Sequence, residues 1–388
     1  MKQGWEYTTF ADVMSPAKSE RCGDRTDLPV LSITMRRGII FQSERFNKVI
    51  ASKDTKDYKI VKEGQLVIAF PIDEGLIYTQ DIAQEGIMSP AYDVWNVDYS
   101  RFNKKFLNLY FHSPWAMKYY KSKLRGTTLR RRMIPKEDLL ALSIPVPPRE
   151  EQEKIVAELD CLSGVIERKR EQLRELDALA QSIFYQMFGD PITNEKGWEV
   201  STIENVCSSI VRGPFGSALK KEYFVEQSNT TYKVYEQKHA IQKDSSIGTY
   251  YISADMFETL SRFEIKEGDI IMSCSGTIGE FYEIPIGAEK GIMNQALLKY
   301  TLNKNIHKIY FLYVMEWVKE NFEKNGSGLQ NIGSVKTIKS TDISLPPLTL
   351  QQEFADKIEA IEKQKQLIKK SIEETETLFN ARMNYYFN

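Results

Sequence analysis

Carboxamide and basic side chains have the clearest chemical potential in this chain, and they suit binding rather than bond making. Gln237 and the adjacent pair Asn294 and Gln295 carry carboxamides, which can form two hydrogen bonds with the edge of an adenine. Arginine and lysine can bond guanine or neutralise phosphates. Glycine-rich turns at 212–217, 275–279 and 326–328 could bring backbone amides close to a phosphate, although an ordinary turn explains each as well. The further candidate contacts to nucleic acid in the C-terminal half of the chain are Arg212, Lys220, Lys221, Lys238, Ser275 and Thr277.

A basic stretch in the first half offers phosphate contacts of the same kind. Residues 118–132 read KYYKSKLRGTTLRRR and contain seven Lys or Arg and no acidic residue. The whole chain has a net charge of -1, so attraction to nucleic acid has to come from such local clusters. A solvated surface lysine is the alternative at any single position. The candidate contacts here are Lys118, Lys121, Lys123, Arg125, Arg130, Arg131 and Arg132.

Motifs for catalysis are missing from the sequence. It has no Asn/Asp-Pro-Pro-Tyr/Phe tetrapeptide of adenine methyltransferases, no phosphate-binding loop with the G-x-x-x-x-G-K-[ST] pattern, no H-E-x-x-H and no G-x-S-x-G. Four scattered cysteines without a C-x-x-C pair and only three histidines argue against a metal site. We therefore expect the chain to bind no cofactor or metal and to catalyse nothing alone. An enzyme would have to rely on acidic residues such as Asp269. His239 is as compatible with a structural role as with a contact to nucleic acid.

An internal repeat divides the chain into two halves. The segment that begins at Ile144 with IPVPPREEQEKIV returns at Ile343 as ISLPPLTLQQEFA, and the match continues without a gap to the C-terminus. A weaker echo links GWEYTTFADV at 4–13 with GWEVSTIENV at 197–206. Each half therefore reads as one globular domain followed by one long helix.

The repeated segments have the pattern of two helices that pair. Apolar residues recur at alternating steps of four and three, which is the seam of a coiled coil. The double prolines mark the helix starts, and Gly189 marks the end of the first helix. Two such seams in one chain can bury each other. The domain between them permits a parallel or an antiparallel pair, but a pseudo-twofold arrangement of the two halves requires the antiparallel one. The predicted pairing residues are Ile155, Leu159, Leu162, Ile166, Leu173, Leu176, Phe354, Ile358, Ile361, Ile368 and Ile372.

The fold class predicted for the globular parts is α+β. Apolar strands are expected at 64–70, 268–273 and 296–302, and aromatic-rich helices at 104–120 and 307–322. The predicted domains are 1–146 and 192–345, with spacer helices at 147–191 and 346–388. No apolar run approaches the roughly 20 residues that cross a membrane, so we expect no membrane association and a cytoplasmic protein.

The layout resembles the specificity subunit of type I restriction-modification enzymes. The resemblance covers the whole chain, and its most specific elements are the two Pro-Pro-x-x-x-Gln helix starts and the duplication. The segments RGPFGSALKKEYF, YEQKHAI, GDIIMSCSGTIGE and NQALL in the second half are similar to that family's target recognition domains. The first half departs from this pattern, since its strand continues as LVIAFPIDEGLIY without the SGTIG loop.

The resemblance implies how such a protein works. Each of two target recognition domains would read one half of a bipartite target in double-stranded DNA, while the helices set the gap and dock two modification (methyltransferase) subunits. Restriction and translocase subunits would join that core. S-adenosylmethionine, ATP and Mg²⁺ would belong to those partners. A coiled-coil scaffold with two peptide- or protein-binding domains is the alternative that the heptads and the near-zero net charge leave open.

Overall fold

The computed structural model describes residues 4–18, 20–35, 37–44, 55–125, 133–215, 218–323 and 335–388. It divides into two compact units, unit 1 of Met1–Glu171 with Ile368–Asn388 and unit 2 of Gln172–Leu367. Both units mix helices and sheets, so the predicted α+β class is confirmed. The predicted division into two globular domains at 1–146 and 192–345 and two spacer helices at 147–191 and 346–388 stays a prediction.

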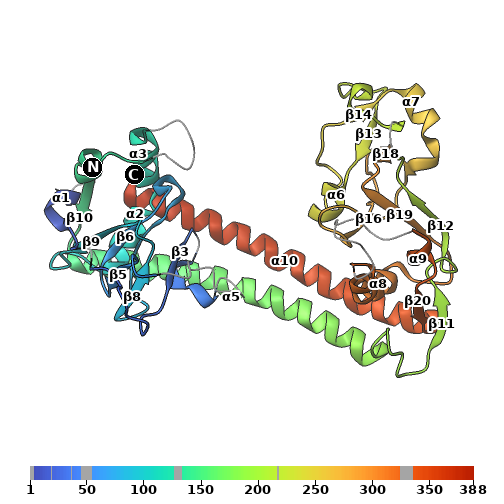
Figure 1. Ribbon diagram of the computed structural model, residues 1–388, viewed down its shortest axis with the longest axis horizontal. Coiled ribbons are helices and arrows are strands. Elements are labelled where there is room, and N and C mark those ends of the chain that lie inside the picture. The colour runs from blue at the N-terminus through green and yellow to red at the C-terminus, as the bar shows by residue number, and fades with distance from the viewer. Residues whose placement is uncertain are drawn as a thin grey trace. The chain divides into compact units, whose positions relative to one another are not determined.

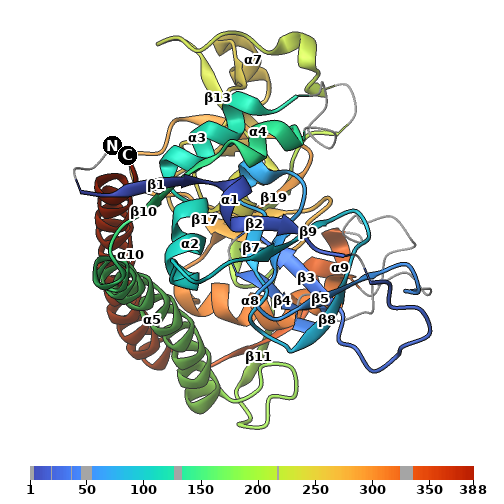
Figure 2. The same ribbon diagram turned by 90° about the vertical axis from the view of Figure 1, so that its left-hand side faces the viewer.

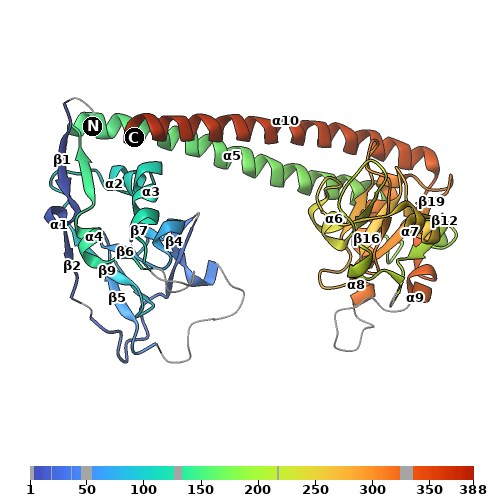
Figure 3. The same ribbon diagram turned by 90° about the horizontal axis from the view of Figure 1, so that it is seen from above.

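Two helices of 40 residues each, α5 (Arg149–Phe188) and α10 (Leu348–Phe387), pack against each other. In unit 1, Glu158 of α5 contacts Arg382 of α10, while Arg170 further along α5 contacts Glu376. In unit 2, Asp177 pairs with Lys365 at 2.7 Å. Partner numbers fall on α10 as they rise on α5, so the pair is antiparallel within each unit. Figures 1, 2 and 3 show the two helices side by side.

The predicted seam is where the helices lose their exposure to solvent. All the predicted pairing residues are buried or half-buried, and the pairing of the helices is confirmed. The buried ones are Ile155, Leu159, Ile166, Phe354, Ile358, Ile361 and Ile372, and the half-buried ones are Leu162, Leu173, Leu176 and Ile368. Polar side chains interrupt the apolar seam: the Lys169 ammonium lies 3.4 Å from the Ser371 carbonyl oxygen and 3.5 Å from the Thr375 hydroxyl. Such polar positions fix the register of a coiled coil.

Unit 1 is built from small antiparallel sheets with short helices packed near them (Figure 2). Its central sheet has the order β2 (Met14–Pro16), β9 (Asp93–Val97), β6 (Leu66–Ile68) and β7 (Ile77–Thr79). Hairpin β3 (Leu31–Thr34) with β4 (Gly38–Phe41) and the pair β5 (Lys59–Lys62) with β8 (Glu85–Met88) accompany it. The helices are α1 (Phe10–Val13), α2 (Lys104–Phe111), α3 (Pro114–Lys123) and α4 (Lys136–Leu140), of which α1 is a single turn.

The helix predicted at 104–120 is two helices. Helix α2 ends at Phe111, and α3 begins at Pro114 with the Ser113 hydroxyl accepting a hydrogen bond from the Ala116 amide. Proline lacks an amide proton and blocks the preceding turn, so it is tolerated only at a helix start. The aromatic pattern continues across the break and conceals it from the sequence.

Unit 2 carries two four-stranded sheets (Figure 1). One has the order β12 (Cys207–Arg212), β19 (Leu297–Leu302), β16 (Ile270–Ser273) and β17 (Phe281–Glu283). The other has the order β14 (Tyr251–Ile252), β13 (Tyr232–Tyr235), β18 (Gly291–Met293) and β15 (Glu264–Ile265), with β13 and β18 parallel. The helices are α6 (Gln237–Gln242), α7 (Ala254–Thr259), α8 (Lys308–Glu323) and α9 (Val335–Lys339). The strands predicted near 268–273 and 296–302 and the helix near 307–322 are confirmed.

The sequence repeat is preserved in the pairing of the strands. Strand β1 (Glu6–Thr9) pairs with β10 (Ser143–Val146), and Glu6 lies opposite Val146. Strand β11 (Glu199–Thr202) pairs with β20 (Asp342–Leu345), and Glu199 lies opposite Leu345. Both sequence echoes therefore meet in one antiparallel pair per unit, with the same register. The two halves are a duplicated structural unit.

The long helices are part of both hydrophobic cores. In unit 1, Leu159 and Phe387 are packed with Phe106 and Tyr110 of α2. In unit 2, Phe184 of α5 stacks on Tyr310 of α8 at 5.8 Å and meets Phe354 of α10 edge-on at 5.6 Å. Aromatic pairs of this kind add stability beyond the area they bury. Within each unit the paired helices are thus fixed to the globular core.

Candidate nucleic-acid interface

Four chain segments that follow strands meet at one place in unit 2. The amide of Asn294, just after β18, donates to the carbonyl oxygen of Tyr235 at the end of β13 (2.9 Å). The Arg212 Nε, at the end of β12, donates to the Gln295 carbonyl oxygen at 3.3 Å. The side-chain amide nitrogen of Gln237, at the start of α6, lies 3.9 Å from where a Cβ on Gly276 would stand. The structure thus brings together the candidate contacts to nucleic acid that the sequence predicted at 212, 237, 275–277 and 294–295.

Gly213 holds two of these segments in contact. A Cβ at this position would stand 1.8 Å from the Asn294 carbonyl oxygen, closer than any side chain allows. The Gly213 amide donates to the Leu297 carbonyl oxygen at 3.0 Å. The missing side chain is therefore what lets the turn after β12 lie against the turn before β19.

The carboxamides differ in whether their hydrogen-bonding groups are already used within the protein. The Asn294 Oδ1 accepts from the Ala296 amide at 3.0 Å, so it shapes its own turn. Gln295 is exposed, and its side chain makes no hydrogen bond within the described residues. Gln237 is half-buried, and its Oε1 is buried without a hydrogen-bond partner among the described residues. Gln295 and Gln237 are therefore the better candidates for contact with a base.

The candidate hydroxyls lie in the turn that follows β16. The Ser273 hydroxyl donates to the Thr277 carbonyl oxygen at 2.6 Å and accepts from the Glu280 amide at 3.0 Å, which closes the turn. Thr277 is exposed and Ser275 is half-buried. Both can reach a ligand from a turn whose backbone is already tied down.

The lysines of this region are partly neutralised by neighbours. Lys220 pairs with Glu222 at 3.3 Å, and Lys238 pairs with Glu236 at 2.6 Å. Lys221 is exposed and has no ion pair within the described residues. Surface ion pairs contribute little in water, so a phosphate can replace the carboxylate at modest cost. The charge pattern fits a surface that tolerates an anionic ligand without being strongly cationic.

The basic stretch of unit 1 acquires acidic partners that its own sequence lacks. Lys123 pairs with Asp138 of α4 at 3.0 Å, and Arg125 lies 3.7 Å from Glu137 and 3.5 Å from Asp138. Lys118 and Lys121 are exposed on α3. Arg130, Arg131 and Arg132 lie outside the described residues, as do Ser217 and the turn at 326–328. Four of the predicted basic contacts can be placed, and two of those are already ion-paired.

Comparison with known proteins identifies the domain in which the four segments of unit 2 meet. Residues 195–377 match the family described as the type I restriction modification DNA specificity domain, and they include every strand of unit 2. Residues 195–377 belong to this family of DNA specificity domains, and the chain over nearly its whole length is similar to a type I restriction enzyme specificity subunit. The resemblance drawn from the helix starts and the duplication is confirmed.

Two curated proteins similar to this chain come from Methanocaldococcus jannaschii. The putative type I restriction enzyme MjaX specificity subunit is 24% identical over 65% of this chain and 60% of its own length. The type I restriction enzyme MjaVIII specificity subunit is 22% identical over 98% of this chain and 92% of its own length. A solved chain from work on complex assembly and conformational transition of the type I R-M system is 18% identical, with a TM-score of 0.62 over 100% of this chain and 98% of that one. That similarity shows a shared fold.

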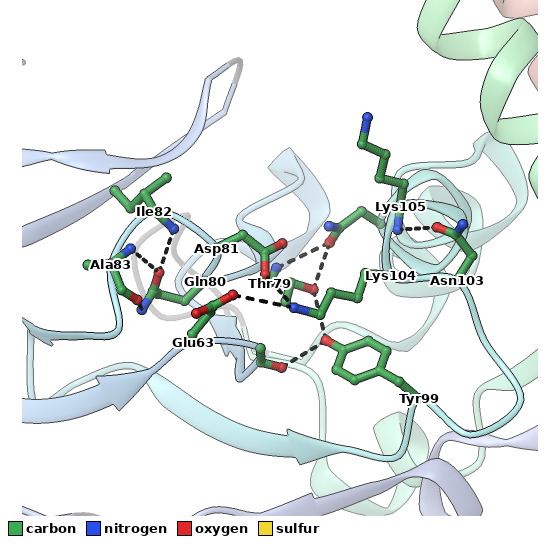
Figure 4. Close-up of polar contacts among 12 residues, drawn as sticks. Glu63, Thr79, Gln80, Asp81, Ile82, Ala83, Tyr99, Asn103, Lys104 and Lys105 are labelled. Carbon is green, nitrogen blue, oxygen red and sulfur yellow. Dashed lines mark hydrogen bonds and ion pairs between the residues drawn. The ribbon is translucent and has the colours of Figure 1, made fainter.

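A polar network in unit 1 that the sequence did not reveal is part of this fold (Figure 4). The Lys104 ammonium at the start of α2 lies 3.1 Å from Asp81 and 4.0 Å from Glu63. The Tyr99 hydroxyl donates to the Gly64 carbonyl oxygen at 2.8 Å, and burial raises the pKa of Tyr99 to about 12. In unit 2, Lys308 at the start of α8 pairs with Glu283 at 2.8 Å in a similar way. Because the arrangement recurs, we interpret it as the attachment of a helix to its sheet.

Asp269, which motivated the enzyme hypothesis, and His239, a candidate contact to nucleic acid, both have structural roles. Asp269 is 3% exposed, pairs with Lys299 at 3.4 Å and accepts from the Thr301 hydroxyl at 2.6 Å. His239 is fully buried, with Nε2 lying 2.7 Å from the Ile247 carbonyl oxygen, and burial lowers its pKa. Within the described ranges, no group of three or more His, Cys, Asp or Glu could hold a metal ion. Over the same ranges, no helix has the length and apolar character of a membrane span.

Proposed function

We propose that this chain recognises double-stranded DNA. The strand-end edge of unit 2, which is formed by residues 212, 237, 275–277 and 294–295, would read one half of a bipartite target. The observation that carries the proposal is the convergence of Arg212, Gln237 and Gln295 on one edge. Guanidinium and carboxamide groups match the edges of guanine and adenine, and exposed Lys221 can meet the backbone. Positions such as these discriminate bases, while the lysines supply affinity.

Unit 1 is the second reader in this proposal. Its sheet β2-β9-β6-β7 has the same strand order as β12-β19-β16-β17 of unit 2. Lys118 and Lys121 on α3 and the basic residues that follow would contact phosphates. The paired helices α5 and α10 would set the gap between the two half-sites. Two weak readers joined by a stiff spacer bind as one, because the second contact becomes intramolecular.

The helices also carry matched exposed residues for docking. Leu179 on α5 is 47% exposed and Leu378 on α10, its counterpart in the repeat, is 49% exposed. Exposed leucines at equivalent places in a duplicated chain suit two copies of one partner. We assign them to two modification subunits, which restriction and translocase subunits would join. S-adenosylmethionine, ATP and Mg²⁺ would be used by those partners, and this chain would catalyse nothing in the cytoplasm where it acts.

Reconstitution with the modification subunit tests the proposal. The purified pair should methylate adenines at one bipartite sequence, which sequencing of methylated DNA would reveal. Replacing residues 1–143 with the matching part of another family member should change one half of that sequence only. A change in both halves, or in neither, would contradict the assignment of one half-site to each unit.

A scaffold that binds proteins is the second candidate, favoured by the ion pairs that neutralise Lys123, Lys220 and Lys238. The two functions differ in their response to salt. DNA affinity should fall steeply as salt rises, because counterions are released when phosphates are contacted. A complex that is indifferent to DNA and to salt would favour the scaffold.

A further inference from the structure

An exposed aromatic ring stands beside the candidate base-reading residues of unit 2. Phe215 has 71% of its surface exposed, and among the described large apolar side chains only Ile286 is more exposed, at 91%. The ring's cationic neighbour is Arg212, whose guanidinium carbon lies 5.7 Å from the ring centroid. Exposure of a large apolar ring to water is unfavourable in the free protein, and burial of that ring against a ligand would stabilise the complex.

The chain presents Phe215 from a fixed support. Gly213 and Pro214, which precede it, are buried, and the Gly213 amide is bonded to the Leu297 carbonyl oxygen at 3.0 Å. Proline restricts the backbone one residue before the ring. The Phe215 carbonyl oxygen accepts from the Ala218 amide at 3.5 Å. The ring is therefore exposed although the backbone that bears it is anchored.

The neighbours of the ring are polar groups suited to bases. Arg212 donates its Nε–H to the Gln295 carbonyl oxygen at 3.3 Å, and the Gln295 side chain is exposed. An aromatic face next to a guanidinium is a surface on which a nucleobase stacks. Apolar side chains inserted at a base step also unstack it and bend the duplex.

We infer that Phe215 packs against a base of the bound half-site and unstacks the neighbouring base step. Arg212 lies over the ring, and the base would pack against the exposed part of it. Phe215 would thus add sequence preference through the deformability of that step, without a hydrogen bond. The inference rests on the proposed function of unit 2 as a DNA reader.

The test uses the complex of this chain with its modification subunit, together with an unmethylated duplex. The duplex contains the bipartite sequence that the complex methylates. 2-Aminopurine is placed at each position of the half-site read by unit 2. Binding of the wild-type complex should raise its fluorescence at one step. F215A should abolish that increase and weaken binding by roughly 5- to 150-fold, while the slope of affinity against salt stays unchanged.

Matched variants separate this role from general damage. F215W should retain both the signal and the affinity, because it keeps an aromatic face. I286A should bind as the wild type does, since Ile286 lies in the turn between β17 and β18, where the Gly287 amide is bonded to Glu267 ahead of β16. Wild-type affinity and an unchanged fluorescence signal in F215A would overturn the inference. Failure of the wild-type complex to bind any sequence specifically would instead overturn the proposed function.

Discussion

Gln152 near the start of α5 and Gln351 near the start of α10 occupy the same place in the two units. The Gln152 Oε1 accepts from the Asn103 amide at 2.8 Å, and its Nε2 donates to the Pro147 carbonyl oxygen at 2.9 Å. The Gln351 Oε1 accepts from the His307 amide at 2.7 Å, and its Nε2 donates to the Pro346 carbonyl oxygen at 2.8 Å. Both side chains are fully buried. The glutamine of the Pro-Pro-x-x-x-Gln motif therefore ties each long helix to the loop before α2 or α8.

Replacing either glutamine should destabilise its own unit. Q152L leaves the Asn103 amide and two carbonyl oxygens unpaired in the interior, which should cost about 2–4 kcal/mol of unfolding free energy. Q351L should destabilise unit 2, because it leaves the His307 amide and the Pro346 carbonyl oxygen unpaired. Urea unfolding followed by fluorescence measures the effect. Q172A, at an exposed position of α5, is the control and should change little; equal effects in Q172A and Q152L would refute the tethering role.

A charge placed in the helix seam should be far more damaging than one outside it. Ile361 is 7% exposed and packs in the core of unit 2, while Leu367 on the same helix is 64% exposed. I361D should lower the unfolding free energy by about 3–5 kcal/mol, because an unpaired carboxylate and a cavity replace a packed side chain. L367D should stay within roughly 0.5 kcal/mol of the wild type. Thermal unfolding monitored by circular dichroism would compare them, and similar melting curves would count against the seam.

The exposed leucines of the helices should control how many modification subunits bind. L179E and L378E should each reduce the number of bound modification subunits from two to one, and the double variant should bind none. The mass of the complex, measured by light scattering after size exclusion, gives the number directly. L367E is the control, since the position that matches Leu367 in the repeat is Arg168. Full occupancy in the double variant would disprove docking at this pair.

Base reading by unit 2 should depend on Gln295. Q295A should weaken specific binding by about tenfold and relax the choice of base at one position of one half-site. Methylation patterns of the reconstituted complex report this choice. Q242A, an exposed glutamine at the far end of α6 from Gln237, should leave the pattern intact. An unaltered pattern in Q295A would exclude this residue from the reading edge.

Unit 2 should lose stability as the pH falls below about 6.5, the ordinary pKa of histidine. Burial lowers the pKa of His239, so the unfolded chain takes up the proton first and the folded state is disfavoured in acid. The loss should be absent at higher pH and level off once the pH is below the folded pKa. Urea unfolding between roughly pH 5 and pH 7.5 measures it. H239Q should show a shallower decline; an identical decline would assign the effect to His307, the other histidine of unit 2, whose pKa is also lowered by burial.

Much of the architecture follows from local patterns that are visible in the chain. The heptad seam from Ile155 to Ile166, the double prolines and Gly189 set the helix limits, because periodicity and helix-ending residues act within a few positions. The break between α2 and α3 escaped because the aromatic residues continue across it, although Pro114 marked the place.

The duplication, the two paired helices and the absence of familiar catalytic motifs were determined by the sequence alone, since each is a matter of composition and spacing. Only the tertiary structure decided that Lys123 and Arg125 meet the acids of α4, that His239 is buried, and that Arg212 contacts Gln295. Those contacts join residues on separate elements, in the last case 83 positions apart. Their formation depends on how strands and turns pack in three dimensions, which no local pattern records.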